Sequence, residues 1–348
     1  MRIGIIGHFG GNENFTDGQT VKTVTLYRAF VNRNINNGAI HCVDTYYIRK
    51  NPIRFIYQMM SMLFFDKKVI VLLSKNGRRV LFPIMYFMCK YLKKEIYHYG
   101  IGGRLAREVS QNAKFKKYVS NFTANWMESV KLRDALLEQG ISNAIFLPNF
   151  KSIKSVETSD LMTEYTMPYS FCTFSRVMES KGITDAIKTI TEINQKAEKT
   201  IAKLDIYGPI EDEYHEELVK SLSASKGACN YCGVIDTNKS VETLRNYYML
   251  LFPTHWRHEG IPGTIIDSFA SGVPVISRRW QYCDEMITNG INGLVYEWDE
   301  PNKLFNQVLY AINNPQKIIA MKENCVHAAS KYLEDAVIEK ICSEMKIR

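Results

Sequence analysis

Short apolar runs alternate with amphipathic stretches along the whole of this chain, and this alternation restricts its fold more than any other feature. In the first half, we expect strands at 3–7, 69–73, 95–99 and 144–148, and helices at 21–32, 79–92 and 125–140. Gly140 is a typical residue for the end of the last of these helices. Alternation of strand and helix predicts a parallel sheet with helices on both faces.

The same alternation starts again after a polar segment, 151–168, which we interpret as a linker between domains. In the second half, we expect strands at 169–175, 203–208, 249–253, 273–277 and 293–297. Two domains are expected because 348 residues exceed what one hydrophobic core usually serves. We predict an α/β protein with two Rossmann-like domains, 1–155 and 156–330, and a C-terminal helix at about 330–348 that packs back on the first domain.

No segment of the sequence predicts passage across a membrane or export. The longest apolar stretch, VLFPIMYFMCKYLKK, contains Lys90 and is shorter than the ~18–20 residues that a spanning helix needs. The first residues lack the apolar core and the cleavage site of a signal peptide. The eight cysteines are scattered, and the lone pair Cys229 and Cys232 has no partner residues at zinc-site spacing. We therefore expect a cytoplasmic protein.

Charge is distributed unevenly between the two halves of the chain. Residues 1–150 contain 22 Lys and Arg against 9 Asp and Glu, whereas residues 151–348 contain 22 against 27. This asymmetry supports two domains and indicates that the first of them contacts an anionic partner. Nucleic acid and an anionic membrane both fit the charge alone.

Glycines follow the first expected strand, in the stretch GHFGGNENFTDGQTVKT. Gly7, Gly10 and Gly11 allow a tight turn, and Gly18 stands where the next helix begins. Free N–H groups at the start of such a helix suit an anion. The spacing is not G-x-G-x-x-G, which disfavours a dinucleotide cofactor. A turn without any ligand would explain these glycines equally well.

A second glycine-rich segment, YHYGIGGRLARE, contains the end of the expected strand at 95–99. Open parallel sheets bind their ligands at the carboxyl ends of the strands. His98 is therefore a candidate for hydrogen-bonding a substrate hydroxyl, although a lone histidine is more often a structural polar residue. Gly102 and Gly103 would let a substrate approach the backbone, and Arg104 is a further candidate on this acceptor side.

Two cations follow the first strand of the second half, in TFSRVMESKGI. Arg176 stands just past the strand, and Lys181 stands five residues later at the expected start of a helix. Arginine can bind phosphate oxygens with two donors and lysine adds a point charge, so the pair suits a diphosphate. A solvated turn is the alternative interpretation.

A short helix is expected at 262–271, in HEGIPGTIIDSFASGVPVIS. Pro262 suits the first helical position and Gly272 the position after the end. Unbonded N–H groups near Gly263 and Thr264 would form an anion site at the start of this helix.

Two carboxylates, Glu259 and Asp267, stand eight positions apart around that helix start. Acids near a helix N-terminus are often only partners of the helix dipole. Carboxylates also accept hydrogen bonds from neighbouring sugar hydroxyls. Two carboxylates with an anion site between them match the sugar groups and the diphosphate of a nucleotide-sugar.

The segments RVMESKG and EGIPGTIIDSFASGVPVI resemble glycosyltransferase family 4 (group 1), whose members are retaining enzymes of GT-B fold. The E-x7-E signature of that family corresponds to Glu259 and Asp267. The segments GHFGGNENFTDGQTVKT, GIGGRLARE and FLPNFK are similar to a subgroup from bacterial surface-polysaccharide clusters. The resemblance covers nearly the whole chain and implies two Rossmann-like domains that face each other across a cleft.

The resemblance also implies a role for each matching residue. Glu259 would contact the donor sugar and support the reacting centre, and Asp267 would hold the ribose hydroxyls. Arg176 and Lys181 would stabilise the departing diphosphate. The chain departs from the family pattern at Asp267, which replaces the commoner glutamate, and at Pro262, where glycine is frequent.

The predicted activity is retaining, metal-independent transfer of a hexose from a UDP- or GDP-linked donor to a saccharide or lipid-linked acceptor in bacterial capsule, exopolysaccharide or lipopolysaccharide assembly. Gly11 and Gly18 are further candidates for donor binding. No cofactor is expected, and the chain lacks the D-x-D pair that chelates a metal in the other large glycosyltransferase fold. Two alternatives remain: a GT-B nucleotide-sugar 2-epimerase and a non-catalytic anion- or nucleic-acid-binding protein. Against nucleic acid, the basic half lacks a recognition helix or an RNA-binding motif.

Basic and apolar residues alternate in segment 51–95, where nine Lys and Arg stand against only Asp66 and Glu95. The apolar stretches FIYQMMSMLFF and VLFPIMYFMCKYL have helical character. We expect this segment to dock on the inner, anionic face of the cell membrane, since each Lys or Arg near such a surface adds ~1 kcal/mol. Packing of both apolar stretches on the sheet, with the lysines merely solvated, is the alternative.

Overall fold

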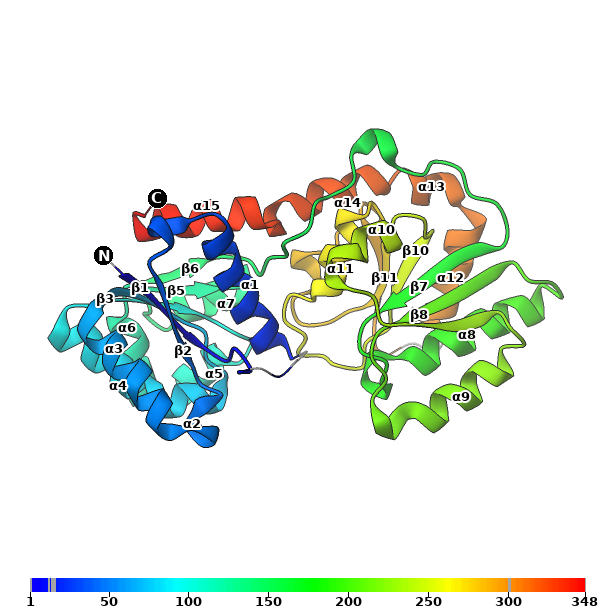
Figure 1. Ribbon diagram of the computed structural model, residues 1–348. Coiled ribbons are helices and arrows are strands. Elements are labelled where there is room, and N and C mark those ends of the chain that lie inside the picture. Colours follow the sequence, from blue (N-terminus) through cyan, green and yellow to red (C-terminus); the bar gives the residue numbers. More distant parts are fainter. Residues whose placement is uncertain (1, 12, 14–16, 300–301, 348) are drawn as a thin grey trace. The chain divides into compact units, whose positions relative to one another are not determined.

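The protein folds into two compact units, shown in a computed structural model that describes residues 2–11, 13, 17–299 and 302–347 (Figure 1). One unit is Met1–Ser152 with Glu334–Arg348, and the other is Ile153–Leu333. Residues 12 and 14–16 of the glycine-rich stretch after the first strand lie outside the described residues.

The first unit contains a parallel six-stranded sheet in the order β2-β1-β3-β4-β5-β6. Ile3, Ile5 and Ile6 lie in β1 (Arg2–Gly7) and are fully buried, as expected for a strand that is covered on both faces. The strands are β1 (Arg2–Gly7), β2 (Ile40–Asp44), β3 (Asp66–Val71), β4 (Glu95–Tyr99), β5 (Ala124–Met127) and β6 (Ala144–Phe146).

Helices cover both faces of this sheet (Figure 1). On one face, α1 (Gly18–Asn32) and α15 (Glu334–Met345) share a core with the strands, in which Leu26 and Phe30 meet Ile338 and Ile341. The C-terminal helix is therefore part of the core of the first unit. The other helices of the unit are α2 (Tyr47–Lys50), α3 (Pro52–Phe65), α4 (Lys75–Leu92), α5 (Leu105–Gln111), α6 (Ala113–Asn121) and α7 (Val130–Leu137).

The second unit also contains a parallel six-stranded sheet, in the order β12-β11-β10-β7-β8-β9. Its strands are β7 (Tyr169–Phe174), β8 (Ala202–Tyr207), β9 (Cys229–Gly233), β10 (Met249–Phe252), β11 (Val275–Arg278) and β12 (Gly293–Tyr296). Its helices are α8 (Ile183–Lys196), α9 (His215–Ala224), α10 (Ser240–Leu244), α11 (Gly263–Ala270), α12 (Lys303–Asn313), α13 (Pro315–Ile319) and α14 (Lys322–Ala329). The predicted α/β class with two Rossmann-like sheets is confirmed.

The helix expected at 125–140 is shorter than predicted, because its first residues belong to a strand. β5 pairs with β4 on one side and with β6 on the other, and all four of its residues are buried. The polar side chain of Asn125 misleads the sequence pattern at this point. Its amide donates to the carbonyl oxygen of Val119 at 2.8 Å, which lets a polar residue stand inside a central strand. Strands β2 and β9 were not expected from the sequence.

The segment 151–168, interpreted as a linker, lies against the second unit over part of its length. The Val156 N–H donates to the carbonyl oxygen of Ala270 at 2.8 Å, and the Val156 side chain is buried. Leu161 approaches Gly272 so closely that a Cβ there would lie 2.1 Å from the leucine Cδ2. Gly272 is therefore needed for this packing as well as for its positive φ of 65° after α11.

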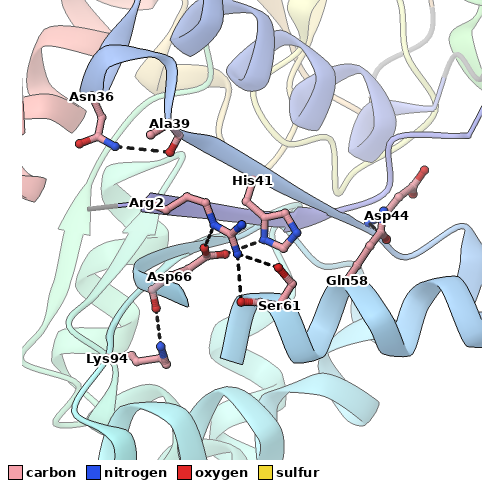
Figure 2. A network of polar contacts seen from close by, with 9 residues as sticks. All are labelled: Arg2, Asn36, Ala39, His41, Asp44, Gln58, Ser61, Asp66 and Lys94. Carbon is pink, nitrogen blue, oxygen red and sulfur yellow. Dashed lines mark hydrogen bonds and ion pairs between the residues drawn. The ribbon is translucent and has the colours of Figure 1, made fainter. Parts of the chain in front are cut away.

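A buried carboxylate, Asp66, joins several elements of the first unit at the amino ends of its strands (Figure 2). It accepts hydrogen bonds from Arg2 Nε and from His41 Nδ1, the latter at 2.7 Å. Arg2 also donates to Ser61 in α3, and Lys94 Nζ donates to the Asp66 carbonyl oxygen. This cluster ties β1, β2 and β3 to α3, at the sheet edge opposite to the one where ligands of such sheets bind.

Candidate functional site

The loops after β7 and β10 bring three of the predicted site residues, Arg176, Lys181 and Glu259, to the carboxyl edge of the second sheet. Lys181 ends a short 3-10 turn that precedes α8, and Glu259 lies in the loop that leads to α11. Lys181 Nζ forms an ion pair and hydrogen bond with Glu259 Oε1. The two side chains are only about 15% and 14% exposed, so the pair is largely shielded from solvent. Shielding strengthens the attraction between these two charges.

Thr254 also holds Glu259, at the same carboxylate oxygen. Its hydroxyl donates to Glu259 Oε1 at 3.2 Å, and it accepts the N–H of Trp256 at 3.1 Å. The His255 N–H donates to the carbonyl oxygen of Ser180 at 2.8 Å, which joins the loop after β10 to the turn that carries Lys181. The Glu259 carboxylate is therefore fixed by a threonine of its own loop and by a lysine 78 residues away.

Gly182 makes this close approach of the two loops possible. It has a φ of 70°, and a Cβ at this position would lie 2.1 Å from the carbonyl oxygen of Pro253. Only glycine combines the left-handed conformation with that contact at little cost. The glycine after Lys181 is thus required by the backbone, and it sets the position of the lysine.

Helix α11 begins beside the same loops. Pro262 is its N-cap rather than its first helical residue, with ψ at 124°, and no described side chain caps the helix. Gly263 and Thr264 begin the first turn, so their N–H groups have no acceptor within the helix. The Thr264 hydroxyl donates to the carbonyl oxygen of Phe174 at the end of β7. The start of α11 is therefore held against the loop that carries Arg176, and it directs partial positive charge towards that region.

Arg176 lies two residues after β7 and its side chain is exposed. The guanidinium makes no hydrogen bond or ion pair with the residues that the structure describes. Arg176, Lys181 and the N-terminus of α11 place three sources of positive charge on neighbouring loops, which is an arrangement that can hold a diphosphate.

Asp267 lies one turn inside α11 and its side chain is only 1% exposed. Its Oδ1 accepts a hydrogen bond from the hydroxyl of Ser240, at the start of α10, at 2.9 Å. A ribose hydroxyl would donate to this carboxylate in the same way as the serine does. Sequence patterns did not single out Ser240 or Thr254. Each is a lone hydroxyl in a loop or at a helix start, and only the folded backbone brings it to a carboxylate.

The start of α1 in the first unit differs from the expected anion site. Asp17 caps this helix and accepts hydrogen bonds from the N–H groups of Gln19 and Thr20. These donors are therefore occupied, and the carboxylate would repel an anion. Gly18 itself is exposed, and a Cβ there would meet no atom within 4 Å.

Gly11 is also engaged by the protein. Its N–H donates to Asp44 Oδ2 at 2.9 Å, and the N–H of Phe9 donates to Asp44 Oδ1 at 2.9 Å. Asp44 ends β2, where an acid that binds the ribose of a dinucleotide would be expected. Here that acid fixes the loop after β1, which further disfavours a dinucleotide cofactor.

His98 is enclosed rather than directed to a strand-end crevice. The ring is 0% exposed, packs against Phe82 with ring centres 4.9 Å apart, and has Nδ1 at 3.2 Å from Asn125 Oδ1. Burial, with a smaller contribution from the nearby charge of Arg78, lowers the pKa of His98 to about 3. The sequence placed His98 near the end of β4 but could not show that its side chain points towards α4.

Gly102, Gly103 and Arg104 lie in the loop between β4 and α5, at the carboxyl edge of the first sheet. Gly102 has a φ of 73° and open space around it, and Arg104 is exposed. Nearby, the buried Lys22 donates to the Gly100 carbonyl oxygen at 2.9 Å and pairs with Glu128. Burial lowers the pKa of Lys22, and its partner Glu128 opposes that shift.

Among the described residues, no group of three or more His, Cys, Asp or Glu side chains is arranged to hold a metal ion. The helices of the described segments are too short or too polar to cross a membrane.

The second unit matches a known enzyme family. Residues 168–314 match the sequence model of the family described as glycosyl transferases group 1. These residues form a group 1 glycosyl transferase domain. The matched segment contains Arg176, Lys181, Glu259 and Asp267.

Known proteins that resemble the chain include glycosyltransferases. The chain is 27% identical over 180 residues to the GtfA subunit of the UDP-N-acetylglucosamine–peptide N-acetylglucosaminyltransferase of Streptococcus agalactiae, a match that spans 49% of this chain and 34% of that protein. The chain thus spans about a third of that relative. The glycosyl transferase domain lies within a chain whose whole length resembles solved structures.

Two solved structures match over nearly the whole chain. HepE of Anabaena, in complex with UDP, superposes with a TM-score of 0.73 at 11% identity, over 99% of this chain and 100% of that one. The lipopolysaccharide outer core galactosyltransferase WaaB superposes with a TM-score of 0.69 at 14% identity, over 99% of both chains. The likeness confirms the predicted GT-B fold of the chain that carries the glycosyl transferase domain.

Proposed function

We propose that this protein transfers a hexose from a UDP- or GDP-linked donor to a saccharide or lipid-linked acceptor in the assembly of a bacterial surface polysaccharide. The group 1 domain match supports a nucleotide-sugar donor. The solved structures of HepE in complex with UDP and with UDP-glucose, and the lipopolysaccharide galactosyltransferase WaaB, support the donor class and the pathway.

The ion pair between Lys181 and Glu259 is the observation that carries this proposal. Without a donor, the lysine neutralises the carboxylate in a site that is largely shielded from solvent. A bound diphosphate offers Lys181 a more highly charged partner. The lysine would then turn to the phosphate, and the released carboxylate of Glu259 would accept hydrogen bonds from the donor sugar. One pair of residues would thus couple binding of the diphosphate to recognition of the sugar.

The remaining donor contacts follow from the neighbouring elements. Arg176 and the N–H groups at the start of α11, Gly263 and Thr264, would bind the phosphates together with Lys181. Asp267 would hold the ribose hydroxyls in place of the Ser240 hydroxyl. In the first unit, the loop after β4, with Gly102, Gly103 and Arg104, would contact the acceptor.

The proposed transfer is retaining and needs no metal. As the bond between sugar and diphosphate breaks, negative charge grows on the departing phosphate. Arg176, Lys181 and the α11 N-terminus would stabilise that charge, and removal of one such donor typically costs about 3–4 kcal/mol. The acceptor hydroxyl would attack from the same face of the sugar as the leaving phosphate and would pass its proton to a departing phosphate oxygen, which keeps the configuration at the anomeric carbon.

The test is transfer from a panel of UDP- and GDP-linked sugars, assayed with and without EDTA. We expect Arg176→Ala and Lys181→Ala each to lower kcat about 10²–10³-fold, while EDTA leaves the wild-type rate unchanged. Lys199→Ala, an exposed lysine of the same unit, is the matched control and should keep full activity. Complete loss of activity in EDTA that Mn²⁺ or Mg²⁺ restores would overturn the metal-independent mechanism. A product epimerised at C2 without any acceptor would identify an epimerase instead.

A further inference from the structure

Two helices of the first unit expose an unusual amount of apolar surface. Of the 21 large hydrophobic side chains that are exposed among the described residues, 11 lie in α3 and α4. Ile53, Tyr57 and Phe64 of α3 are 81%, 76% and 68% exposed. The remaining eight are Ile56, Met60, Phe65, Val80, Ile84, Phe87, Tyr91 and Leu92.

These exposed residues form a second apolar face on each helix. The sheet side of α3 is already occupied by the buried Met59 and Met62, and that of α4 by Phe82, Met85 and Met88. The exposed residues recur at intervals of three and four, for example Val80, Ile84, Phe87 and Tyr91, which places them on one side of the helix. Packing on the sheet therefore accounts for one face of each helix and leaves the other unexplained.

Both helices cover the same face of the first sheet, opposite to α1 and α15 (Figure 1). We define the docking surface as the eleven exposed apolar residues of α3 and α4. A patch of this kind is rare on a soluble monomer and usually marks a contact with a partner or a membrane.

Unbalanced positive charge surrounds this surface. Residues 47–121 contain 16 Lys and Arg but only three acids, Asp66, Glu95 and Glu108. Each of the three acids is already paired inside the unit, with Arg2, Lys68 and Arg78 respectively. The exposed cations of this range include Arg54, Lys67, Lys75, Arg79, Lys90, Lys93, Lys114, Lys116 and Lys117.

We propose that the docking surface binds an anionic lipid bilayer, with the apolar residues of α3 and α4 at the level of the headgroups and acyl chains, and with the surrounding Lys and Arg on lipid phosphates. Amphipathic helices that lie in a membrane interface combine the same two features. Lysine is depleted at protein–protein interfaces, and this disfavours a protein partner. This proposal deepens the proposed function and rests on it, because docking would bring the transferase to a lipid-linked acceptor.

Two basic residues of the region, Arg78 and Lys68, are buried and cannot contact lipid phosphates. Arg78 is 2% exposed and binds Glu108 with two nitrogens, and Lys68 is buried against Glu95. Both maintain the fold of the first unit. A test of docking must therefore change the exposed cations and leave these two in place.

Flotation of the full-length protein with vesicles tests the proposal. Wild type should bind phosphatidylglycerol-containing vesicles at low salt, bind pure phosphatidylcholine vesicles far more weakly, and lose most of its binding at high salt. The charge variant carries Lys67→Glu, Lys75→Glu, Arg79→Glu and Lys90→Glu and should bind at least about a hundred-fold more weakly, since each lost cation costs about five-fold. The matched control carries Lys199→Glu, Lys203→Glu, Lys220→Glu and Lys226→Glu in the second unit and should lose far less.

A second variant separates insertion from simple charge attraction. Ile53→Gln, Tyr57→Gln and Phe64→Gln together remove apolar surface from α3 while keeping residues that form helices well. Its binding to anionic vesicles should fall at least about ten-fold, with unchanged thermal unfolding. Binding equal to that of wild type would overturn insertion.

Binding of UDP in the absence of vesicles separates this proposal from the proposed function. Wild type that binds UDP but never floats with anionic vesicles would overturn the docking surface and leave the transferase proposal standing. Wild type that floats with anionic vesicles but binds no nucleotide-sugar would overturn the transferase proposal and leave the docking surface standing. Self-association through these residues, without vesicle binding, would assign the surface to a second copy of the chain and overturn the proposal.

Discussion

Lys181 and Glu259 form an ion pair across two loops, although 78 residues separate them in the chain. The pair stands beside the start of α11 and is largely shielded from solvent. In the proposed function, a donor would separate this pair and bind Lys181 through its diphosphate and Glu259 through its sugar.

The first prediction concerns the carboxylate of this pair. Glu259→Gln should lower kcat for transfer about 10²–10³-fold, because a contact to the reacting sugar is lost. UDP affinity should stay the same or rise, since Lys181 no longer has to leave a charged partner. Steady-state transfer and UDP calorimetry measure the two effects, with Glu213→Gln, an exposed acid of the same unit, as control. Full activity in Glu259→Gln would remove this residue from the catalytic site.

The second prediction separates the ribose role of Asp267 from its structural role. Asp267→Asn keeps the size of the side chain but weakens it as an acceptor of ribose hydroxyls, so UDP affinity should fall about ten-fold. Ser240→Ala removes the present hydrogen bond to Asp267 and no ligand contact, so UDP affinity should change less than about two-fold. Calorimetry of both variants decides the point, after thermal unfolding has shown that they are folded. Equal UDP affinity in Asp267→Asn and wild type contradicts the assignment.

The third prediction concerns Gly182. Gly182→Ala places a Cβ 2.1 Å from the Pro253 carbonyl oxygen in a residue with φ of 70°. Gly227→Ala in the same unit has φ of 83° but open space around the Cβ, so it carries the backbone cost alone. We expect about 1 kcal/mol of destabilisation for Gly227→Ala and at least about 2–3 kcal/mol for Gly182→Ala. Urea unfolding measures the free energy of unfolding of both variants. Equal losses in the two would show that the loops at Gly182 and Pro253 separate easily.

The fourth prediction is a pH dependence that arises from His98. Its pKa is about 3 in the folded protein, because burial disfavours the charged ring, against 6.5 for the free side chain. The unfolded chain therefore binds a proton below pH ~6.5 that the folded chain does not, so stability is lost as the pH falls. His98→Gln cannot titrate, and its stability relative to wild type should rise by about 2 kcal/mol between pH ~7.5 and ~5. Urea unfolding at both pH values measures the change. His327→Gln, an exposed histidine, is the control, and a parallel response of His98→Gln and wild type would contradict the assigned burial effect.

The fold was predictable because apolar strand runs in parallel sheets carry a strong pattern. Of the twelve strands among the described residues, nine followed from this pattern, including β7 and β10, which precede the loops that carry Arg176, Lys181 and Glu259. β5 was missed because Asn125 interrupts its apolar run, and β9 because its CNYCG sequence contains few apolar residues. A local sequence pattern predicts which residues of one segment are buried. It does not predict the hydrogen-bond partner, here the Val119 carbonyl oxygen, that lets a polar residue such as Asn125 be buried.

The candidate site was predictable where a residue type alone carries the chemistry. Arg176, Lys181 and Glu259 stand in loops at strand ends, and the fold of a parallel sheet brings such loops to one edge. The pairing of Lys181 with Glu259 was not predictable, because it depends on the approach of two loops at Gly182. The hydrogen bonds of Asp17 at the start of α1 and of Asp44 to the loop after β1 escaped prediction for a similar reason: either carboxylate could equally have been a ligand for a substrate.

Because α15 belongs to the first unit, the second unit is inserted between two segments of the first along the chain. Residues 153–333 are contiguous, whereas the core around Ile3 and Phe30 also needs Ile338 and Ile341 from the end of the chain. During translation, the second unit can therefore complete its core before the first one does, which reverses the usual order from the N-terminus. Until α15 is made, the core on this face of the first sheet lacks Ile338 and Ile341, and its apolar side chains stay open to solvent.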